Sequence, residues 1–453
     1  MTNNKGDEGL KRVIGVPGLA LSIVNGVIGS GIFVLPAIVG MALGAFGIFG
    51  YIFCGIMLAA IMLCYAEIGS KVTCSGGSYA YVEAAFGDFP GYVVNWLYFF
   101  GWSVLGSAAV INILVDSLAV LFPALQNPSM RAVIICTLIG LMVMINIRGV
   151  KQSIWLVKII AIIKLLPLLG IIVFGFPKIN TANLQWEQLP SLKKFGETAF
   201  ILFYAFAGFE TCLCVGGEFK NPKRTVPLGI FLGGLIILII YLLLQTITQG
   251  ILGTDIAGFK EAPLAAVAEK IAGPVATTVL LFTAAISCFG NVSADIMATP
   301  RSLFAAANNG LFPKFLAKVH PTFATPHLAI IIYGLLILVF SISGGFKQLA
   351  ILASAAILLI YLSVILSTIR LRLNKKYTDE NTFRAPGGLG FPIIGIISII
   401  WLLSSLSKWE ILSTLIFLVA VSLLYVLSKQ FGKNKRAHES IYPMSKGKEP
   451  SKN

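Results

Sequence analysis

Long apolar segments, separated by short polar connections, constrain the fold of this chain more than any other feature. About twelve of them reach the roughly 20 residues that a helix needs to cross a bilayer. In hydrocarbon each backbone polar group needs an internal partner, which a helix supplies. Only 12% of the 453 residues are charged, against about 25% in soluble domains. The sequence therefore predicts an all-α polytopic membrane protein with about twelve transmembrane helices, whose approximate centres are Gly26, Met57, Gly106, Leu141, Leu166, Phe206, Leu238, Ser287, Gly334, Leu358, Ile399 and Leu418.

Lysine and arginine gather in alternate connections between these segments. Arg148 and Lys151 lie between the fourth and fifth segments, and Lys220, Lys223 and Arg224 lie between the sixth and seventh. Cytoplasmic connections carry such an excess. We therefore expect cytoplasmic N and C termini in a plasma membrane, a bacterial inner membrane. The net charge of +15 then reflects orientation in the lipid bilayer and not a nucleic-acid partner.

Cysteine and histidine usage argues against metal, cofactor and enzymatic chemistry. The seven cysteines are an odd number and include no C-x-x-C pair. The three histidines, His320, His327 and His438, lie in connections or in the tail. An enzyme within the bilayer would need clustered histidines, paired catalytic carboxylates or a cysteine–histidine pair. We expect no metal, no cofactor and no enzymatic activity.

The first apolar segment contains a cluster of small residues at positions 25–36. Gly26, Gly29, Ser30 and Gly31 fall where a membrane helix should be continuous. Glycine in a helix interior costs up to about 1 kcal/mol relative to alanine. One interpretation is a deliberate helix break that offers backbone N–H and C=O groups to a ligand. The other is a small-residue face for close helix packing.

The sixth apolar segment carries a second candidate break. Ala207 and Gly208 lie next to the acidic Glu210 in the middle of this segment. The first and sixth segments would begin corresponding halves of five segments each. Because five is odd, the second half must be inserted upside down. Interrupted segments at matching positions of inverted halves are typical of a transporter binding site, and this favours the helix-break interpretation.

This organisation divides the chain into seven parts. Two inverted repeats of five segments are followed by two extra segments, with short connections and tails between and around them. The expected boundaries are 1–13 for the cytoplasmic N-terminus, 14–177 for the first repeat, 178–194 for an extracellular loop, 195–376 for the second repeat, 377–390 for a cytoplasmic loop, 391–430 for the last two segments and 431–453 for a basic cytoplasmic tail.

The two breaks suggest which ligand they bind. We expect the first half of segment one to end near residues 23–26, and the second half to begin near Ser30 with free amides and the positive end of a helix dipole. A carboxylate suits the amides of Ser30 and Gly31, and an ammonium suits carbonyls of Ile23 and of Tyr204 and Ala207. A zwitterion that carries both groups would fit, and an α-amino acid is one such molecule.

These motifs resemble the amino acid–polyamine–organocation transporter superfamily. The resemblance implies a LeuT-type inverted repeat, with helices 1 and 6 broken at mid-membrane, alternating access and a midplane amino acid site. It covers about the first 375 residues, and it rests on residues 29–33 (GSGIF), 206–210 (FAGFE), 218–227 (EFKNPKRTVP), 146–149 (NIRG), 299–301 (TPR) and 310–313 (GLFP).

The resemblance implies roles for individual residues. Ser30 and Gly31 would hold the substrate carboxylate, and Ile28 and Gly29 would complete the unwound turn. Tyr204 would be an aromatic gate over the substrate. The remaining implied residues are Ala207 and Gly208 at the second break, with Glu210 near the inner gate, as a hydrogen-bond partner or a proton acceptor.

Two further charged residues lie inside apolar segments, where they are costly. Some sodium-independent members of the superfamily have a lysine at the position of Lys164. We hypothesise that its ammonium replaces sodium and bonds carbonyls of the first segment and the eighth; the alternative is a structural tether. Asp295 could pair with Lys164, line the inner pathway, face a cationic substrate or pair with a basic residue of the inner gate.

The wall of the pocket is less defined by the sequence. Aromatic Trp102 and Phe206 could shape it, although aromatic residues in a membrane bundle more often contact lipid or core. Ser103, Gly106 and Ser354 are further candidates.

Together these features predict a secondary active amino acid transporter. We expect neutral L-amino acids as substrates and sodium-independent transport, by proton symport or amino acid exchange. The alternative is a cationic amino acid or polyamine antiporter, because Glu210 and Asp295 could attract positive charge. A receptor that does not transport, or a channel, is a remote alternative.

Overall fold

The computed structural model describes residues 14–72, 77–148, 154–186, 188–213, 219–308, 314–323, 325–373 and 383–431. Helices make up nearly all of this part of the chain, and a single isolated bridge pairs Ile14 with Phe219. The α-helices are α1 (Val16–Val27), α2 (Gly31–Leu43), α3 (Gly47–Lys71), α4 (Ser78–Phe86), α5 (Asp88–Trp96), α6 (Leu105–Leu121), α7 (Pro128–Ile147), α8 (Ile154–Gly175), α9 (Leu192–Phe203), α10 (Pro222–Leu252), α11 (Pro263–Ala272), α12 (Pro274–Asn308), α13 (His327–Ser343), α14 (Phe346–Leu373), α15 (Gly390–Ser404) and α16 (Lys408–Phe431).

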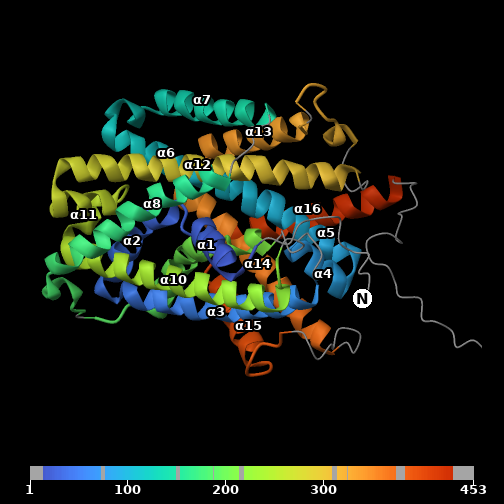
Figure 1. Cartoon of the computed structure of the whole chain (residues 1–453), viewed down its shortest axis with the longest axis horizontal. Coiled ribbons are helices and arrows are strands. Elements are labelled where there is room, and N and C mark those ends of the chain that lie inside the picture. The colour runs from blue at the N-terminus through green and yellow to red at the C-terminus, as the bar shows by residue number, and fades with distance from the viewer. Residues whose placement is uncertain are drawn as a thin grey trace, which may run out of the picture.

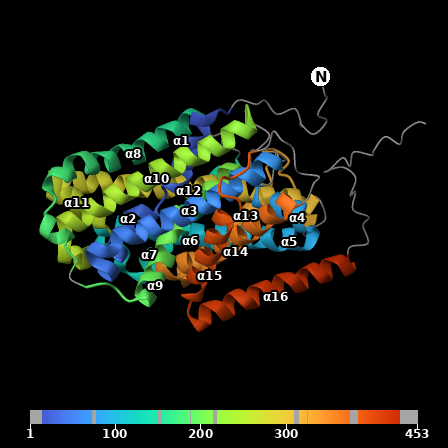
Figure 2. The ribbon, with the colours of Figure 1, turned by 90° about the horizontal axis from the view of Figure 1, so that it is seen from below.

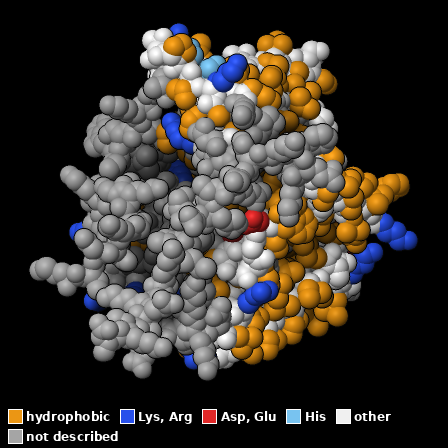
Figure 3. All heavy atoms as spheres, turned by 90° about the vertical axis from the view of Figure 1, so that its right-hand side faces the viewer, with side chains coloured by type: hydrophobic (Ala, Val, Ile, Leu, Met, Phe, Trp, Pro, Cys, Tyr) orange, Lys and Arg blue, Asp and Glu red, His pale blue; other side chains and the backbone are white. Residues whose placement is uncertain are grey.

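Apolar helices of membrane-spanning length confirm the predicted class of a helical membrane protein. Among the described residues, seven helical stretches are long and apolar enough to cross a bilayer, and three shorter apolar helices accompany them. Each of the twelve expected centres lies in a helical element. Much of the surface coloured in Figure 3 is hydrophobic, with Lys and Arg as separate points. The expected tail 431–453 and N-terminus 1–13 lie outside the described residues, apart from Phe431.

The first apolar segment is interrupted between α1 and α2. Residues 28–30 are not helical, and the amide of Gly29 bonds back to the carbonyl of Val27 at 2.7 Å. Ser30 is the residue that precedes α2. The run of small residues is therefore a break in the helix rather than a packing face on an unbroken one.

The sixth apolar segment is interrupted in a similar way. α9 continues into a short turn, η6 (Tyr204–Phe206), after which Ala207 is extended, and a second turn, η7 (Phe209–Leu213), follows. Gly208 joins the two turns with φ +115°. This φ lies in a region that L side chains rarely adopt, which is the physical reason for a glycine here.

Helix packing brings the two interrupted segments together. α1 packs against α10 and η7, and α10 packs against α3. α6 packs against α12 and α14. In Figure 1 these helices form the body of the molecule, with α7 and α13 along one edge. Figure 2 shows α16 along another side, where it contacts α5 and α14.

Candidate functional site

The two helix breaks lie in direct contact. A Cβ added to Gly208 would lie 3.3 Å from the carbonyl oxygen of Gly26, and a Cβ added to Gly26 would lie 3.5 Å from Sγ of Cys212. Glycine at 26, in the last turn of α1, and at 208, in the second break, thus lets the two backbones approach each other closely. The close approach creates one composite site from segments about 180 residues apart in the sequence.

Tyr241 of α10 joins both breaks. Its hydroxyl lies within hydrogen-bond distance of the carbonyl oxygens of Ala205 (2.9 Å) and Val27 (3.2 Å), to which it donates. Its ring packs against that of Phe206, with centroids 5.1 Å apart. Tyr241 is fully buried. Sequence reasoning missed it, because a tyrosine in an apolar helix carries no local sign of a partner elsewhere.

The start of α2 offers amides to the composite site. The first amides of a helix have no intrahelical partner, and they lie at the positive end of the helix dipole. Ser30 and Gly31 occupy this position, and both are buried. A Cβ on Gly31 would lie 3.3 Å from Cβ of Ala205. The start of α2 therefore lies against the second break, and Ser30 and Gly31 are shielded there from solvent.

The end of α1 lies close to the expected boundary, but the role of Ile23 needs a correction. α1 ends at Val27, one residue beyond the expected range of 23–26. The carbonyl of Ile23 is consequently inside the helix, where carbonyls accept from the amide four residues on. Ile23 is fully buried, and its side chain lies in the space beside Gly233 of α10. It contributes packing there, and the prediction of a free carbonyl at Ile23 was wrong.

Lys164 of α8 bonds the first break. Its Nζ donates to the carbonyl oxygen of Ile28 at 2.8 Å and to that of Asn25. The side chain is buried, with 5% of the residue exposed. A cation at the C-terminal end of α1 is favourable, because the helix dipole is negative there. The Lys164 ammonium therefore binds the carbonyl oxygens at the first break directly.

Glu210 bonds the second break. Its Oε2 accepts from the Tyr361 hydroxyl of α14 at 2.5 Å and from the Gly208 amide at 3.1 Å. These bonds tie the turn after Gly208 to α14. The carboxylate is buried, with 1% of the residue exposed.

Asp295 of α12 lies among three hydroxyl groups. It accepts from Ser107 at 2.7 Å, from Thr299 at 2.9 Å and from Tyr333. These partners belong to α6, α12 and α13, so Asp295 links three neighbouring helices. In the described part of the chain no ion pair joins it to Lys164 or to another basic residue, which corrects the two pairings considered from the sequence.

The expected pocket wall is partly assembled around Tyr204. Its hydroxyl donates to the carbonyl of Gly106 at 3.1 Å, and its ring lies 5.8 Å from those of Trp102 and Phe346. Trp102 and Ser103 belong to η2 (Leu97–Val104), a wider π-helical turn of a kind often found at functional sites.

Phe206 and Ser354 are the other candidates for the pocket wall. Phe206 is fully buried, and its ring packs against those of Tyr51 and Tyr241. Ser354 of α14 is fully buried, and its hydroxyl has no hydrogen-bond partner among the described residues.

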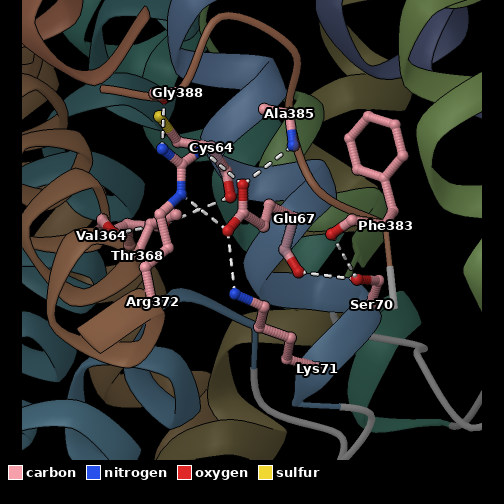
Figure 4. Close-up of polar contacts among 10 residues, drawn as sticks. All are labelled: Cys64, Glu67, Ser70, Lys71, Val364, Thr368, Arg372, Phe383, Ala385 and Gly388. Carbon is pink, nitrogen blue, oxygen red and sulfur yellow. Dashed lines mark hydrogen bonds and ion pairs between the residues drawn. The ribbon is translucent and has the colours of Figure 1, made fainter. Parts of the chain in front are cut away.

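A buried charge cluster at one end of the bundle was not predicted. Glu67 of α3 accepts from Nε and Nη2 of Arg372 of α14, at 2.7 and 2.5 Å, and from Nζ of Lys71 at 2.8 Å. The amide of Ala385 donates to the same carboxylate at 2.9 Å (Figure 4). Glu67 is completely buried. Four donors on one carboxylate satisfy a charge that would otherwise be costly to bury.

This cluster joins three separate parts of the chain. Arg372 also donates to the carbonyl of Gly388, and the Ser70 hydroxyl lies 3.3 Å from the carbonyl of Phe383 (Figure 4). Phe383, Ala385 and Gly388 are thereby held against the ends of α3 and α14. Of the partners of Glu67 only Lys71 is close in the sequence, so the local sequence gives no sign of the cluster.

No group of three or more metal-ligating side chains occurs within the described ranges. Apolar helices of membrane-spanning length, with two interrupted segments in contact with each other, are typical of a membrane transporter. The chain belongs to the amino acid permease family, whose model matches residues 14–425. It is accordingly an integral membrane permease of amino acids and not an enzyme.

Three curated relatives illustrate the range of this family. The chain is 28% identical to the serine/threonine exchanger SteT of Bacillus subtilis over 88% of this chain and 92% of SteT. It is 24% identical to the branched-chain amino acid permease BcaP of the same organism, over 93% and 94% of the two chains. A methylthioribose transporter of Bacillus subtilis is 26% identical over the same shares.

Proposed function

We propose that this permease is a secondary active transporter of neutral L-amino acids that works without sodium. The observation that carries the proposal is the contact of two helix breaks, one of which is occupied by the buried ammonium of Lys164. A transporter in which a lysine ammonium already binds these carbonyl oxygens does not need a sodium ion at the same place. Exchange of one amino acid for another, or symport with protons, then remains as the driving mode.

The substrate would lie between the two breaks. Its carboxylate would accept from the amides at the start of α2, at Ser30 and Gly31, where the helix dipole favours an anion. Its ammonium would face the carbonyls of the second break, from Tyr204 to Ala207. Tyr204 would cover the bound molecule. Because these groups are buried in the present conformation, substrate entry and release require the helices around the breaks to move.

We also propose the inverted-repeat topology for this chain. Residues 14–177 and 195–376 would form two repeats of opposite orientation, with both termini in the cytoplasm of a bacterial cell. Residues 391–430 would add the last two helices. The distribution of basic residues supports this orientation, and the matching positions of the two breaks support the repeat.

Neutral substrates are favoured over cationic ones. Two of the relatives are named for serine and threonine and for branched-chain amino acids, which are neutral. Glu210 and Asp295, the two acids that could attract a cationic substrate, already accept hydrogen bonds from protein groups. A cationic amino acid or polyamine antiporter is therefore the second candidate.

Uptake into proteoliposomes tests the proposal. A panel of labelled neutral, cationic and anionic amino acids, with a polyamine and methylthioribose, would be offered to vesicles with and without internal substrate. We expect uptake of neutral amino acids, either accelerated by internal substrate or driven by an imposed proton gradient. Uptake confined to cationic compounds would refute the neutral assignment, and binding without uptake would indicate a receptor.

A further inference from the structure

One face of α10 carries a polar side chain at every fourth residue. Tyr241, Gln245 and Gln249 follow one another at this spacing, which places them on the same side of the helix. Tyr241 bonds the two breaks. Gln245 and Gln249 continue the row away from the breaks, toward the end of α10. They are buried, with 1% and 6% of the residue exposed.

The two amides have unused hydrogen-bonding groups. Both the oxygen and the nitrogen of the Gln245 amide are without a partner among the described residues, as is the oxygen of the Gln249 amide. The Gln249 nitrogen donates to the carbonyl of Asn183 at 3.4 Å. A buried polar group without a hydrogen bond is destabilising, because it has lost its contact with water and gained no partner. The three unpartnered amide atoms, on side chains one helical turn apart, point to a ligand that both donates and accepts.

Gln245 and Gln249 belong to the lining of a cavity of about 260 Å³ that is formed by α10, the start of α3, and Leu184 and Trp186 of the preceding connection. The residues that line it are Ala45, Ile48, Phe49, Leu184, Trp186, Gln245, Thr246 and Gln249. Glycines leave room for the amides: a Cβ on Gly40 would lie 3.0 Å from the Gln249 oxygen, and one on Gly47 would lie 3.5 Å from the Gln245 nitrogen. The cavity is slightly below the roughly 300–1,000 Å³ of drug-sized ligand sites, so it suits one ring-sized group.

The chemistry of the lining selects a neutral hydroxylated group. Among the described residues that line the cavity none is charged, so these residues offer no counter-charge to a phosphate or an ammonium. Carboxamides bind hydroxyl groups both as donors and as acceptors. Phe49 and Trp186 also line the cavity, with ring centroids 4.8 Å apart, and they offer an apolar surface to the C–H face of a sugar.

An apolar surface continues from the cavity along the packed pair of α3 and α10. Ile52 and Ile56 of α3 and Leu235 and Ile239 of α10 are exposed, and Gly55 lets Leu238 approach between them. In a membrane protein such a surface faces acyl chains. Trp186 is also half exposed, and tryptophan is typical of the bilayer interface. The cavity and the apolar surface of α3 and α10 could thus bind the headgroup and the acyl chains of one lipid.

We propose that this cavity binds the sugar headgroup of a neutral glycolipid, a glycosyl diacylglycerol. The amides of Gln245 and Gln249 would hold the sugar hydroxyls, the rings of Phe49 and Trp186 would cover its apolar face, and the acyl chains would lie along α3 and α10. Because Tyr241 lies one turn from Gln245 on the same helix, the occupied site would reach the position of α10 that bonds both breaks.

Native mass spectrometry of the full-length protein tests this inference. Purified protein would be titrated with monoglucosyl diacylglycerol, and in separate arms with phosphatidylcholine, with phosphatidylglycerol and with methyl glucoside. We expect Gln245→Leu, alone or with Gln249→Leu, to weaken glycolipid binding at least tenfold. Gln348→Leu, at an exposed position of α14, is the matched control and should bind like the wild type.

The outcomes separate the possibilities. Gln245→Leu removes an amide that has no partner, so the thermal stability of the lipid-free variant should equal or exceed that of the wild type, and weaker binding cannot then be ascribed to misfolding. Trp186→Ala, at an exposed loop position, should weaken binding as well. Equal binding of the phospholipids, binding of methyl glucoside as tight as that of the glycolipid, or glycolipid binding unaffected by Gln245→Leu would each overturn the proposal.

Discussion

Replacing Arg372 with methionine should destabilise the folded protein, because the buried carboxylate of Glu67 loses its guanidinium partner. Methionine fills much of the same volume but removes two donors from the Glu67 carboxylate and one from the Gly388 carbonyl. The side chains of Arg372 and Glu67 are 5% and 0% exposed, so water cannot replace these donors in the folded state. Removing one partner of a buried ion pair costs about 3–5 kcal/mol.

The remaining partners set the expected value. Lys71 and the Ala385 amide still donate to Glu67 in the variant, which favours the lower end of that range. We expect Arg372→Met to lower the free energy of unfolding by about 3 kcal/mol. Glu67→Gln should cost a similar amount, because it leaves Arg372 and Lys71 without a counter-charge.

A double-mutant cycle measures the interaction itself. The free energy of unfolding would be followed by SDS titration in mixed micelles, with thermal unfolding in detergent as a second measure. The combined loss in Glu67→Gln/Arg372→Met should be at least about 1 kcal/mol smaller than the sum of the single losses, since residues in one ion-pair network couple by about 0.5–3 kcal/mol.

Arg370→Met is the matched control for this cycle. Arg370 lies on the same helix with its guanidinium 4.8 Å from the centroid of the Phe86 ring, a contact worth about 0.5–1 kcal/mol at an exposed site. If Arg372→Met were no more destabilising than Arg370→Met, or if the two cluster substitutions were additive, the cluster would not be the stabilising contact inferred from its geometry.

Three further predictions concern the breaks. Lys164→Ala should reduce transport to background while the protein still purifies as a folded monodisperse species, whereas exposed Lys347→Ala should transport normally; comparable flux in both would reduce Lys164 to a tether. Replacing sodium with choline on both sides of proteoliposomes should leave the initial uptake rate unchanged, and a strong dependence on sodium would contradict the role given to Lys164. Gly208→Ala, at φ +115°, should lose about 1–3 kcal/mol of stability and impair substrate binding, whereas Gly140→Ala in open space on α7 should do neither; unimpaired binding by Gly208→Ala would show that the second break tolerates regular backbone.

The sequence by itself determined the class of the protein and the positions of the two breaks. Segment length and the scarcity of charge decide membrane insertion, because both are properties of a local stretch of chain. Glycines near 29–31 and 207–208 mark non-helical backbone for the same reason, since backbone freedom belongs to the residue itself. Motif resemblance then led to the family without any knowledge of contacts.

The tertiary structure alone decided the partners of the buried polar groups. Lys164 bonds a carbonyl 139 residues away, Asp295 a hydroxyl 188 residues away, and Glu67 a guanidinium 305 residues away. Each of these charges must find donors or acceptors somewhere once it is removed from water. The number and identity of these donors and acceptors depend on which helices become neighbours. An isolated acid or lysine in an apolar segment therefore indicates that a partner exists, and only the packed bundle shows which residue it is.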